Sequence, residues 1–222
     1  MLSANDCAVL FDLDGVIVDT KEAHFASFVQ LGKEVGYSIS EDLFRSVFGR
    51  RNEYIFPFLY GEDLPKERVA WLSQRKEEIF RDMIRGNVQA LPGAVELLHA
   101  LKASGFHLAI GTSTPRENLE MILASLGVET LFDTKVTSED VTKGKPDPQV
   151  FCLGAERLGV PPAHCVVVED AVAGVEAALN GGMKALGVTT NHSRESLAKA
   201  TRVVDSLAEV APDDFLALCN TK

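Results

Sequence analysis

The sequence contains few cysteines, a single tryptophan and no long hydrophobic run. The four cysteines (Cys7, Cys152, Cys165 and Cys219) stand far apart and form neither a CxxC pair nor a ligand-like spacing with histidine. A disulfide framework or a zinc site is therefore not expected. No stretch reaches about 18 apolar residues, and the start of the chain lacks the basic and long apolar segments of a signal peptide. We expect a cytoplasmic protein with reduced thiols and no membrane association.

Basic residues are also in the minority. Lys and Arg number 22 against 32 Asp and Glu, which gives a formal net charge of -10. Because no basic stripe is present to neutralise the phosphates of a duplex, we do not expect nucleic acid as a partner. The 222 residues, 46% of them hydrophobic, suit one large or two small globular domains with a real core. Nothing in the sequence bears on oligomeric state, and we take a monomer as the default.

The hydrophobic pattern changes twice along the chain. An apolar run from Ala8 to Phe11 predicts a buried strand, and the pattern from residue 19 to 88 is helical and rich in phenylalanine. After Leu91, helical and strand patterns alternate, which is typical of a mostly parallel sheet with helices on both faces. We therefore predict an α/β core domain formed by residues 1–18 and 89–222, with an α-helical domain inserted at 19–88.

Within the inserted domain, the pattern predicts a helix over about 66–85 with an apolar stripe at helical spacing. The stripe consists of Val69, Leu72, Ile79, Phe80 and Met83. We expect it to pack against the other phenylalanine-rich helices.

Side chains mark the start of two helices. Ser40, which precedes two acidic residues, is expected to cap a helix of the inserted domain. Thr114, with Pro115 next and Glu117 three residues later, has the pattern of a capping box. The helix start predicted there follows the Gly111-Thr112-Ser113 turn and is suited to hold a phosphate group.

Two carboxylates follow the first predicted strand. Asp12 and Asp14 flank one residue and precede Gly15. Alternate residues of an extended segment point the same way, so both carboxylates face one pocket and repel each other unless a cation or a shared proton intervenes. A hard cation such as Mg2+ is the natural partner for these oxygen atoms. Taken alone, however, the DxDG pattern fits a polar turn equally well.

Further polar residues stand at other predicted strand ends or in adjoining loops: Thr112, Lys145, Glu169 and Asp170. Right-handed crossovers bring the carboxyl ends of parallel strands to one edge of the sheet, where ligands bind. Singly, each residue has a structural explanation as a turn hydroxyl, a solvated charge or a capping acid. Their joint occurrence at one edge favours a functional site.

Four ordered segments resemble the motifs of the haloacid dehalogenase (HAD) superfamily: DLDGVIVDT, the Gly-Thr-Ser turn, GKPDP and VVVEDAVAGVEAA. The resemblance spans nearly the whole chain. It implies a HAD-like Rossmannoid core, and the helical insertion resembles the small cap of the subfamily of phosphoglycolate phosphatases, sugar-phosphate phosphatases and β-phosphoglucomutases.

The resemblance also implies catalytic roles. Asp12 is expected to attack phosphorus and form an aspartyl-phosphate. Asp14 is expected to protonate the leaving oxygen and then to accept a proton from water. Thr112 and the amides after it are expected to bind the transferring phosphoryl group, with Lys145 supplying positive charge.

The same resemblance implies a Mg2+ site. Its expected ligands are the Asp12 carboxylate, a backbone carbonyl at Asp14 and the Asp170 carboxylate, with Glu169 nearby or outside the first shell. The ion is expected to shield the anionic phosphate from the anionic nucleophile.

Substrate and cap roles are expected for residues of the inserted domain and of the loop after the second motif: Thr20, His24, Arg51, Ser113 and Arg116. The resemblance implies that Thr20 and His24, at the hinge into the cap, help to couple its closure to chemistry. For His24, a packed or solvated position on its helix is an equal alternative. Arg51 belongs to a basic loop suited to a distal phosphate or carboxylate, although a solvated surface arginine fits almost as well. Neighbouring Arg50 is the second candidate.

We therefore expect a Mg2+-dependent phosphatase that acts on a small phosphorylated metabolite, such as a sugar phosphate or phosphoglycolate. The alternative is a phosphomutase of the β-phosphoglucomutase type, although the chain has Arg50-Arg51-Asn52 and Thr114-Pro115-Arg116 where those mutases carry a serine-rich loop and a Ser-Lys-Asn run. Dehalogenation and phosphonate cleavage are disfavoured because Asp14 is present. A non-catalytic phosphometabolite-binding protein remains the alternative from another functional class.

Overall fold

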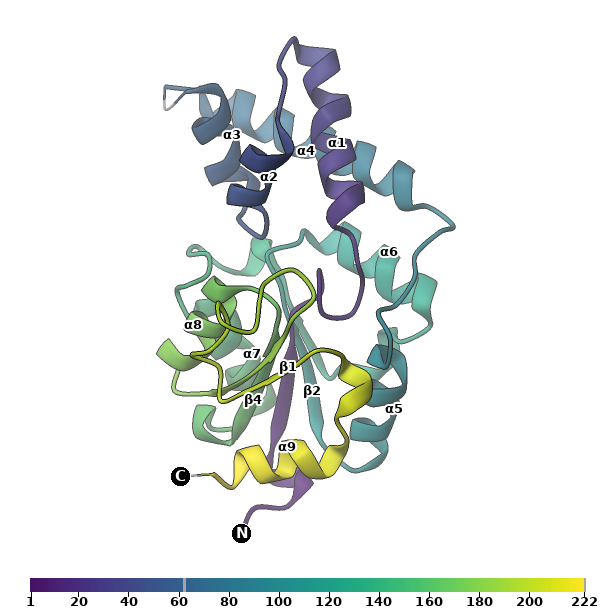
Figure 1. The fold of residues 1–222 in the computed structure, drawn as a ribbon, viewed down its shortest axis with the longest axis vertical. Coiled ribbons are helices and arrows are strands. Elements are labelled where there is room, and N and C mark those ends of the chain that lie inside the picture. The colour runs from purple at the N-terminus through teal and green to yellow at the C-terminus, as the bar shows by residue number, and fades with distance from the viewer. Residues whose placement is uncertain (62, 222) are drawn as a thin grey trace. The chain divides into compact units, whose positions relative to one another are not determined.

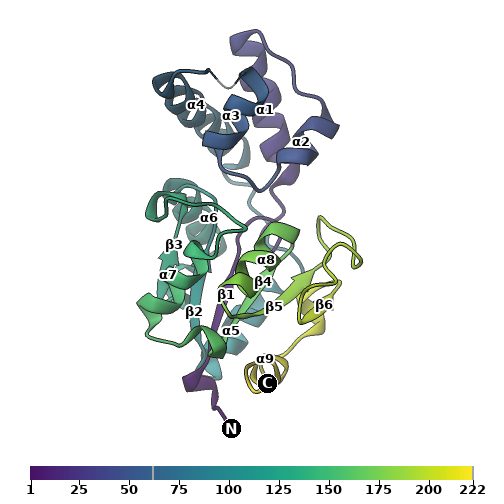
Figure 2. The ribbon, with the colours of Figure 1, turned by 90° about the vertical axis from the view of Figure 1, so that its left-hand side faces the viewer.

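The computed structural model describes residues 1–61 and 63–221, and the chain forms two compact units (Figures 1 and 2). The first, here called the core unit, comprises Met1–Asp19 and Gln89–Lys222, and the second, the helical unit, comprises Thr20–Val88. In the core unit, the segments that lead into and out of the helical unit pair through an antiparallel bridge between Val18 and Ala90. Among residues 1–61 and 63–221, none of the helices combines the length and apolar character that crossing a bilayer requires.

The core unit is built on a six-stranded parallel sheet with the order β3-β2-β1-β4-β5-β6. The strands are β1 (Ala8–Phe11), β2 (His107–Gly111), β3 (Thr134–Val136), β4 (Cys165–Glu169), β5 (Lys184–Val188) and β6 (Arg202–Val204). Every residue of β1 and β4 is buried, as expected for central strands covered on both faces. The α/β class and the parallel sheet predicted from the sequence are confirmed.

Helices cover both faces of this sheet (Figure 2). Helices α7 and α8 pack on one face, while α5 and α9 pack on the other. The helices of this unit are α5 (Ala94–Ala103), α6 (Arg116–Leu126), α7 (Gln149–Leu158), α8 (Val172–Asn180) and α9 (Pro212–Cys219). On the α7 and α8 side, inward-facing residues of the strands join one hydrophobic cluster with Phe151 and Val175. The sheet is thus a buried, rigid platform for its carboxyl-end loops.

The strand order reverses between β1 and β4. From β1 the sheet continues outward through β2 to β3, whereas β4, β5 and β6 extend on the other side of β1. In the register, Phe11 lies level with Val168, so the residues that follow β1 lie beside the end of β4. Ligands of open α/β sheets bind at such a switch point.

The helical unit consists of α1 (Lys21–Val35), α2 (Glu41–Val47), α3 (Asn52–Tyr60) and α4 (Lys66–Ile84). Its hydrophobic cluster is rich in phenylalanine and includes Phe28, Phe44 and Phe56. The predicted stripe of α4 is buried at Val69, Leu72, Ile79 and Phe80, but Met83 is 42% exposed. Ser40 caps α2 as predicted, because its hydroxyl oxygen accepts a hydrogen bond from the amide of Leu43 at 3.2 Å.

The helical unit also buries a charged cluster that the sequence pattern did not indicate. Lys76 is 2% exposed, and its Nζ lies 3.0 Å from Oε1 of Glu77 and 2.6 Å from Nδ1 of His24. The Glu77 oxygen also accepts a 2.7 Å hydrogen bond from Asn52. The His24 ring stacks on Phe80 with ring centroids 3.9 Å apart. His24 is therefore a buried residue that contacts a charged group inside its own unit.

Candidate active site

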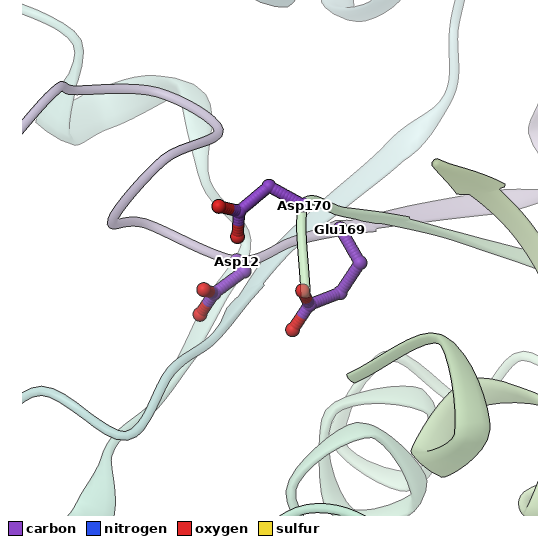
Figure 3. Close-up of side chains that lie close together, drawn as sticks. All are labelled: Asp12, Glu169 and Asp170. Carbon is purple, nitrogen blue, oxygen red and sulfur yellow. The ribbon is translucent and has the colours of Figure 1, made fainter. Parts of the chain in front are cut away.

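Three buried carboxylates meet where β1 and β4 end (Figure 3). Asp12 directly follows β1, and its amide donates a 3.0 Å hydrogen bond to the carbonyl of Val168. Glu169 is the last residue of β4, and Asp170 follows it. One carboxylate oxygen from each of Asp12, Glu169 and Asp170 lies within 4.8 Å of the others. Asp12 and the adjacent pair Glu169 and Asp170, far apart in sequence, are thus brought together at the switch point of the sheet.

Lys145 places a positive charge against two of these carboxylates. Its Nζ, which comes from the loop before α7, lies 2.7 Å from Oε1 of Glu169 and 2.9 Å from Oδ1 of Asp12. The contact with Asp12 has the geometry of an ion pair but not of a hydrogen bond, so this buried oxygen keeps its lone pairs. The ammonium also lies 4.7 Å from the ring centre of Phe151. Lys145 is therefore held in place by two carboxylates and by the aromatic ring of Phe151.

The charges at this site shift one another's pKa values. Burial raises the pKa of Asp12 to about 7, with Glu169 and Asp14 acting in the same direction and Lys145 opposing them. Burial, followed by the charges of Glu169 and Asp12, raises the pKa of Asp170 well above its usual value. Burial alone would lower the pKa of Lys145, but Asp12 and Glu169 raise it above its usual value. The lysine stays charged, while the two aspartates hold protons more tightly than exposed aspartates do.

Glu169 is held on both of its oxygen atoms. Its Oε1 accepts the hydrogen bond from Lys145, and its Oε2 accepts one from the amide of Ala171 at 2.8 Å. A Cβ atom at Gly174 would lie 1.8 Å from Oε1 of Glu169, so the glycine of the fourth motif is needed to make room for this side chain. These contacts fix the orientation of the Glu169 carboxylate beside Lys145.

The Asp14 side chain does not join the three-carboxylate cluster but contacts Thr114. The hydroxyl of Thr114 donates a short hydrogen bond to Oδ2 of Asp14. The prediction that Thr114 caps α6 is therefore wrong: Pro115 occupies the cap position, and the first amide of the helix, that of Arg116, donates to Oε1 of Glu139 at 3.2 Å. The amide of Thr114 donates to the hydroxyl oxygen of buried Thr112 at 3.1 Å. Thr112 and Asp14 are thus linked through Thr114, whose local sequence pattern indicates only a helix cap.

Two further residues contact the site from the loop after β5. Nδ2 of Asn191 donates to Oδ2 of Asp170 at 2.7 Å, and Nδ1 of His192 lies 3.0 Å from the Asp170 carbonyl oxygen. Neither residue was predicted. A usable signal was available, because the loop also follows the carboxyl end of a strand in the same sheet.

The structure divides the predicted substrate residues between the two units. Ser113 and Arg116 belong to the core unit, where Ser113 follows Thr112 and Arg116 begins α6. The Arg116 guanidinium is already ion-paired with Asp140 at 2.8 Å and with Glu139 at 3.7 Å.

Thr20, His24 and Arg51 belong to the helical unit. Thr20 precedes α1 and its carbonyl accepts the amide hydrogen of His24 at 2.9 Å. Arg51 is the cap residue of α3, and its Nε lies 3.4 Å from Glu53. Their roles towards a substrate remain predictions.

The carboxylate cluster fits a hard divalent cation. All donor atoms are oxygens, and Oδ1 of Asp12 is buried without a hydrogen bond. Carboxylate oxygens are the ligands that Mg2+ and Ca2+ prefer, whereas neither cysteine nor histidine takes part in the cluster. Asp12, Glu169 and Asp170 could together hold such an ion, and Glu169 already accepts hydrogen bonds from Lys145 and the Ala171 amide.

Comparison with known proteins shows the family to which this fold and this carboxylate cluster belong. Residues 9–188 match the family of haloacid dehalogenase-like hydrolases. The chain belongs to this family. The matched residues include the four motifs noted in the sequence and the three carboxylates of the cluster. The chain is an enzyme of a hydrolase family.

Two relatives are phosphatases of small phosphorylated compounds. The HAD-family chain is 35% identical over 215 residues to the "phosphorylated carbohydrates phosphatase" of Thermotoga maritima, covering 94% of this chain and 96% of the relative. It is 31% identical over 210 residues to the validoxylamine A 7'-phosphate phosphatase of Streptomyces hygroscopicus subsp. limoneus, covering 90% and 94%. Both alignments span the core and helical units.

A solved structure resembles the HAD-family chain over nearly its full length. The β-phosphoglucomutase of Clostridium difficile superposes with a TM-score of 0.87 and 26% identity, covering 99% of this chain and 98% of the other. The chain is therefore similar both to proteins named as phosphatases and to one named as a phosphomutase.

Proposed function

We propose that this protein is a Mg2+-dependent phosphatase that hydrolyses a small phosphorylated metabolite through a phosphoryl intermediate on Asp12. The observation that carries the proposal is the buried contact of Asp12 with Lys145, next to Asp170 and at the end of the central strand. Relatives that cover nearly the whole chain and act on phosphorylated carbohydrates support the reaction class.

Asp12 is suited to act as the nucleophile. Its backbone is fixed to β4 by the hydrogen bond to Val168, and its carboxylate is oriented by Lys145. An oxygen of Asp12 attacks phosphorus while the bond from phosphorus to the ester oxygen breaks, leaving the phosphoryl group on Asp12. Because the pKa of Asp12 is about 7, positive charge near the carboxylate is needed to keep it ionised.

Asp14 is suited to move the two protons of the reaction. It lies two residues from the nucleophile, and the hydrogen bond from Thr114 fixes its orientation. Asp14 donates a proton to the departing ester oxygen. As a carboxylate it then accepts a proton from the water that attacks the phosphorus of the aspartyl-phosphate, which releases Asp12 and phosphate.

Thr112 and Lys145 are suited to bind the transferring phosphoryl group. Thr112 is buried at the carboxyl end of β2, and its amide hydrogen bond to Val136 fixes its backbone. Lys145 presents a permanent charge beside Asp12. Positioning and charge stabilisation of this kind provide most of the catalysis in phosphoryl transfer.

Asp12, the main-chain carbonyl of Asp14 and Asp170 would hold Mg2+, which when bound supplies charge neutralisation between the nucleophile and the phosphate. Its binding also favours the ionised form of Asp12 and Asp170, against the burial that raises their pKa values. The proposed cation therefore resolves the electrostatic conflict within the carboxylate cluster.

The helical unit is proposed to act as a cap that selects the substrate. It is inserted directly after the first motif, and Arg51 stands at the start of α3. An arginine there is suited to grip a second anionic group of the substrate. Thr20 and His24 are proposed to couple movement of the cap to chemistry, and the whole protein is proposed to work as a monomer.

A phosphomutase is the second candidate, because the β-phosphoglucomutase of Clostridium difficile has closely similar structure. One experiment separates the two. Purified enzyme is given sugar phosphates, phosphoglycolate, and β-glucose 1-phosphate with a trace of the 1,6-bisphosphate, with Mg2+ or with chelator, and phosphate release is measured beside isomer formation.

We expect Mg2+-dependent phosphate release to exceed isomer formation, and Asp12→Asn to lower turnover by orders of magnitude without changing the circular dichroism spectrum. Full activity in chelator would refute the metal assignment. More than about a tenth of wild-type activity in Asp12→Asn would refute covalent catalysis by this residue. Isomer formation far above phosphate release would make the enzyme a mutase.

A further inference from the structure

The loop after β5 holds Asp170 at two separate atoms. The Asn191 amide group donates to the carboxylate oxygen Oδ2 at 2.7 Å, while the His192 ring contacts the main-chain carbonyl oxygen at 3.0 Å. A carbonyl oxygen only accepts hydrogen bonds, so Nδ1 of His192 carries the hydrogen in this contact. One residue thus orients the carboxylate of Asp170 and the next one holds its backbone.

The loop is itself fixed at both ends. The amide of Thr189 donates to the carbonyl of Val204 at 3.1 Å, and its hydroxyl donates to Asp205 at 2.8 Å. Arg194, on the far side of the two site residues, donates to the same Asp205 oxygen at 2.8 Å and to the carbonyl of Val203 at 2.7 Å. The segment from 189 to 194 is therefore braced on β6 and presents Asn191 and His192 from a fixed position.

The glycine of the first motif packs against the same pair. Gly15 has a φ angle of +80°, and a Cβ atom there would lie 2.2 Å from Oδ2 of Asp170 and 2.6 Å from Nδ2 of Asn191. The Asp170–Asn191 hydrogen bond thus fills the space that the missing side chain leaves. Gly15 of the first motif, Asp170 of the fourth motif and Asn191 of the loop after β5 thus pack together at the Asp170–Asn191 hydrogen bond.

A neutral amide is well suited to this place. Asp170 is surrounded by Asp12 and Glu169, so a third acidic neighbour would add repulsion, while a lysine or arginine would compete with a cation for the carboxylate. The Asn191 amide takes up lone-pair capacity on Oδ2 without changing the net charge. The rest of the carboxylate stays available to a metal ion, in a fixed orientation.

We propose that Asn191 and His192, through their two contacts with Asp170, are positioning residues that hold it in the orientation required of a metal ligand. The inference rests on the proposed function, because it requires that Asp170 bind Mg2+. Outer partners of this kind commonly change metal affinity by about 10- to 100-fold when they are removed.

The test is a direct measurement of Mg2+ binding to the purified full chain by isothermal titration calorimetry, without substrate. The variants are Asn191→Ala, His192→Ala and the control Ser193→Ala, whose exposed hydroxyl contacts the hydroxyl and the amide of Ser196 and not Asp170. We expect Asn191→Ala to raise the Kd for Mg2+ about 10-fold or more, His192→Ala to raise it by a smaller factor, and Ser193→Ala to leave it unchanged. The Mg2+-dependent rise in unfolding temperature should shrink in the same order.

Several outcomes would overturn the inference. If wild type binds Mg2+ and Asn191→Ala binds it with a Kd within twofold of wild type, Asn191 does not position Asp170. If Asn191→Ala loses its fold, Asn191→Leu replaces it, because leucine has a similar volume but no donor for Asp170, and unchanged Mg2+ affinity in that variant has the same meaning. If wild type itself shows no Mg2+ binding, the metal assignment of the proposed function fails, which is a distinct result.

Discussion

Replacing Lys76 by methionine should destabilise the helical unit through the charge it leaves on Glu77. Nζ of Lys76 lies 3.0 Å from Glu77 and near the rings of Phe28 and Phe80, at 5.0 and 5.2 Å from their centres. Methionine fits such apolar surroundings, but it removes the ammonium beside a glutamate that is 6% exposed. Removing one partner of a buried ion pair typically lowers the free energy of unfolding by about 3–5 kcal/mol.

The double variant Lys76→Met/Glu77→Gln tests this cause. Glutamine retains an acceptor for the 2.7 Å hydrogen bond from Asn52, and no buried charge is left without its partner. Replacing both members of a buried pair is often neutral or stabilising, so most of the lost stability should return. Glu78→Gln, which removes a half-buried charge paired with Arg75 on the same helix, is the matched control and should stay near wild type.

Urea unfolding followed by tryptophan fluorescence is the appropriate assay. Trp71 is the sequence's single tryptophan and lies on α4, so its signal reports on the helical unit. Comparable stability of Lys76→Met and wild type would refute the assigned contribution of the ion pair. A double variant as unstable as Lys76→Met would instead assign the loss to packing around residue 76.

The effect should depend on pH in a defined direction. Burial alone would raise the pKa of Glu77, but Lys76, His24 and the hydrogen bond from Asn52 lower it below its usual value of 4.5. A lowered pKa adds stability above pH 4.5, and this stability is lost as the pH falls through the folded-state pKa. The difference between wild type and Lys76→Met should therefore shrink on acidification. A difference that grows below pH 4.5 would contradict this reasoning.

Two further predictions concern the core unit. Burial, together with Glu169 and Asp14, raises the pKa of Asp12 from 3.8 to about 7, so in chelator the native state loses stability as the pH rises through this range. In thermal unfolding, the free energy of unfolding of Asp12→Asn should then exceed that of wild type by up to about 4 kcal/mol at pH 8. This difference should grow between pH 4 and 7, and a difference independent of pH would contradict the raised pKa of Asp12. Thr114→Val, which removes the hydrogen bond to Asp14, should slow turnover of a sugar phosphate about tenfold or more, whereas Thr114→Ser should retain most activity. The single-turnover burst from p-nitrophenyl phosphate should change little, because that leaving group departs without a proton; an equal loss in both assays would indicate a general structural role.

Local patterns in the sequence predicted much of the fold. Buried strands appear as apolar runs, and Ser40 caps the helix that it precedes because its bond partner is only three residues away. Thr114 has the same local pattern, but its hydroxyl binds Asp14, 100 residues away in sequence. A tertiary partner thus displaced the local one. A capping pattern in the sequence indicates only hydrogen bonds between residues that are close in sequence. It contains no information on a partner that the tertiary fold brings near.

The buried charge of Lys76 was missed for a different reason. Lys76 lies midway between Leu72 and Phe80 at four-residue spacing, which places it on the buried stripe of α4. The spacing was a usable signal, but a reading that counts only apolar residues leaves charged positions out of the stripe. Asn191 and His192 follow β5, a strand that belongs to none of the four motifs, so only the general tendency of ligands to bind at the carboxyl ends of strands indicates them.

The topology explains why the residues named by the motifs meet and why they need so many partners. Because β1 and β4 are neighbours in register, the backbone forces Asp12 against Glu169 and Asp170 regardless of their mutual repulsion. Lys145 neutralises one of these charges, and the remaining contacts to Glu169 and Asp170 come from neutral donors, the Ala171 amide and the Asn191 side chain. Neutral donors fix the orientation of the carboxylates but leave excess negative charge in a buried place. That combination is what a divalent cation requires of its site, whereas a second lysine would have removed the need for one.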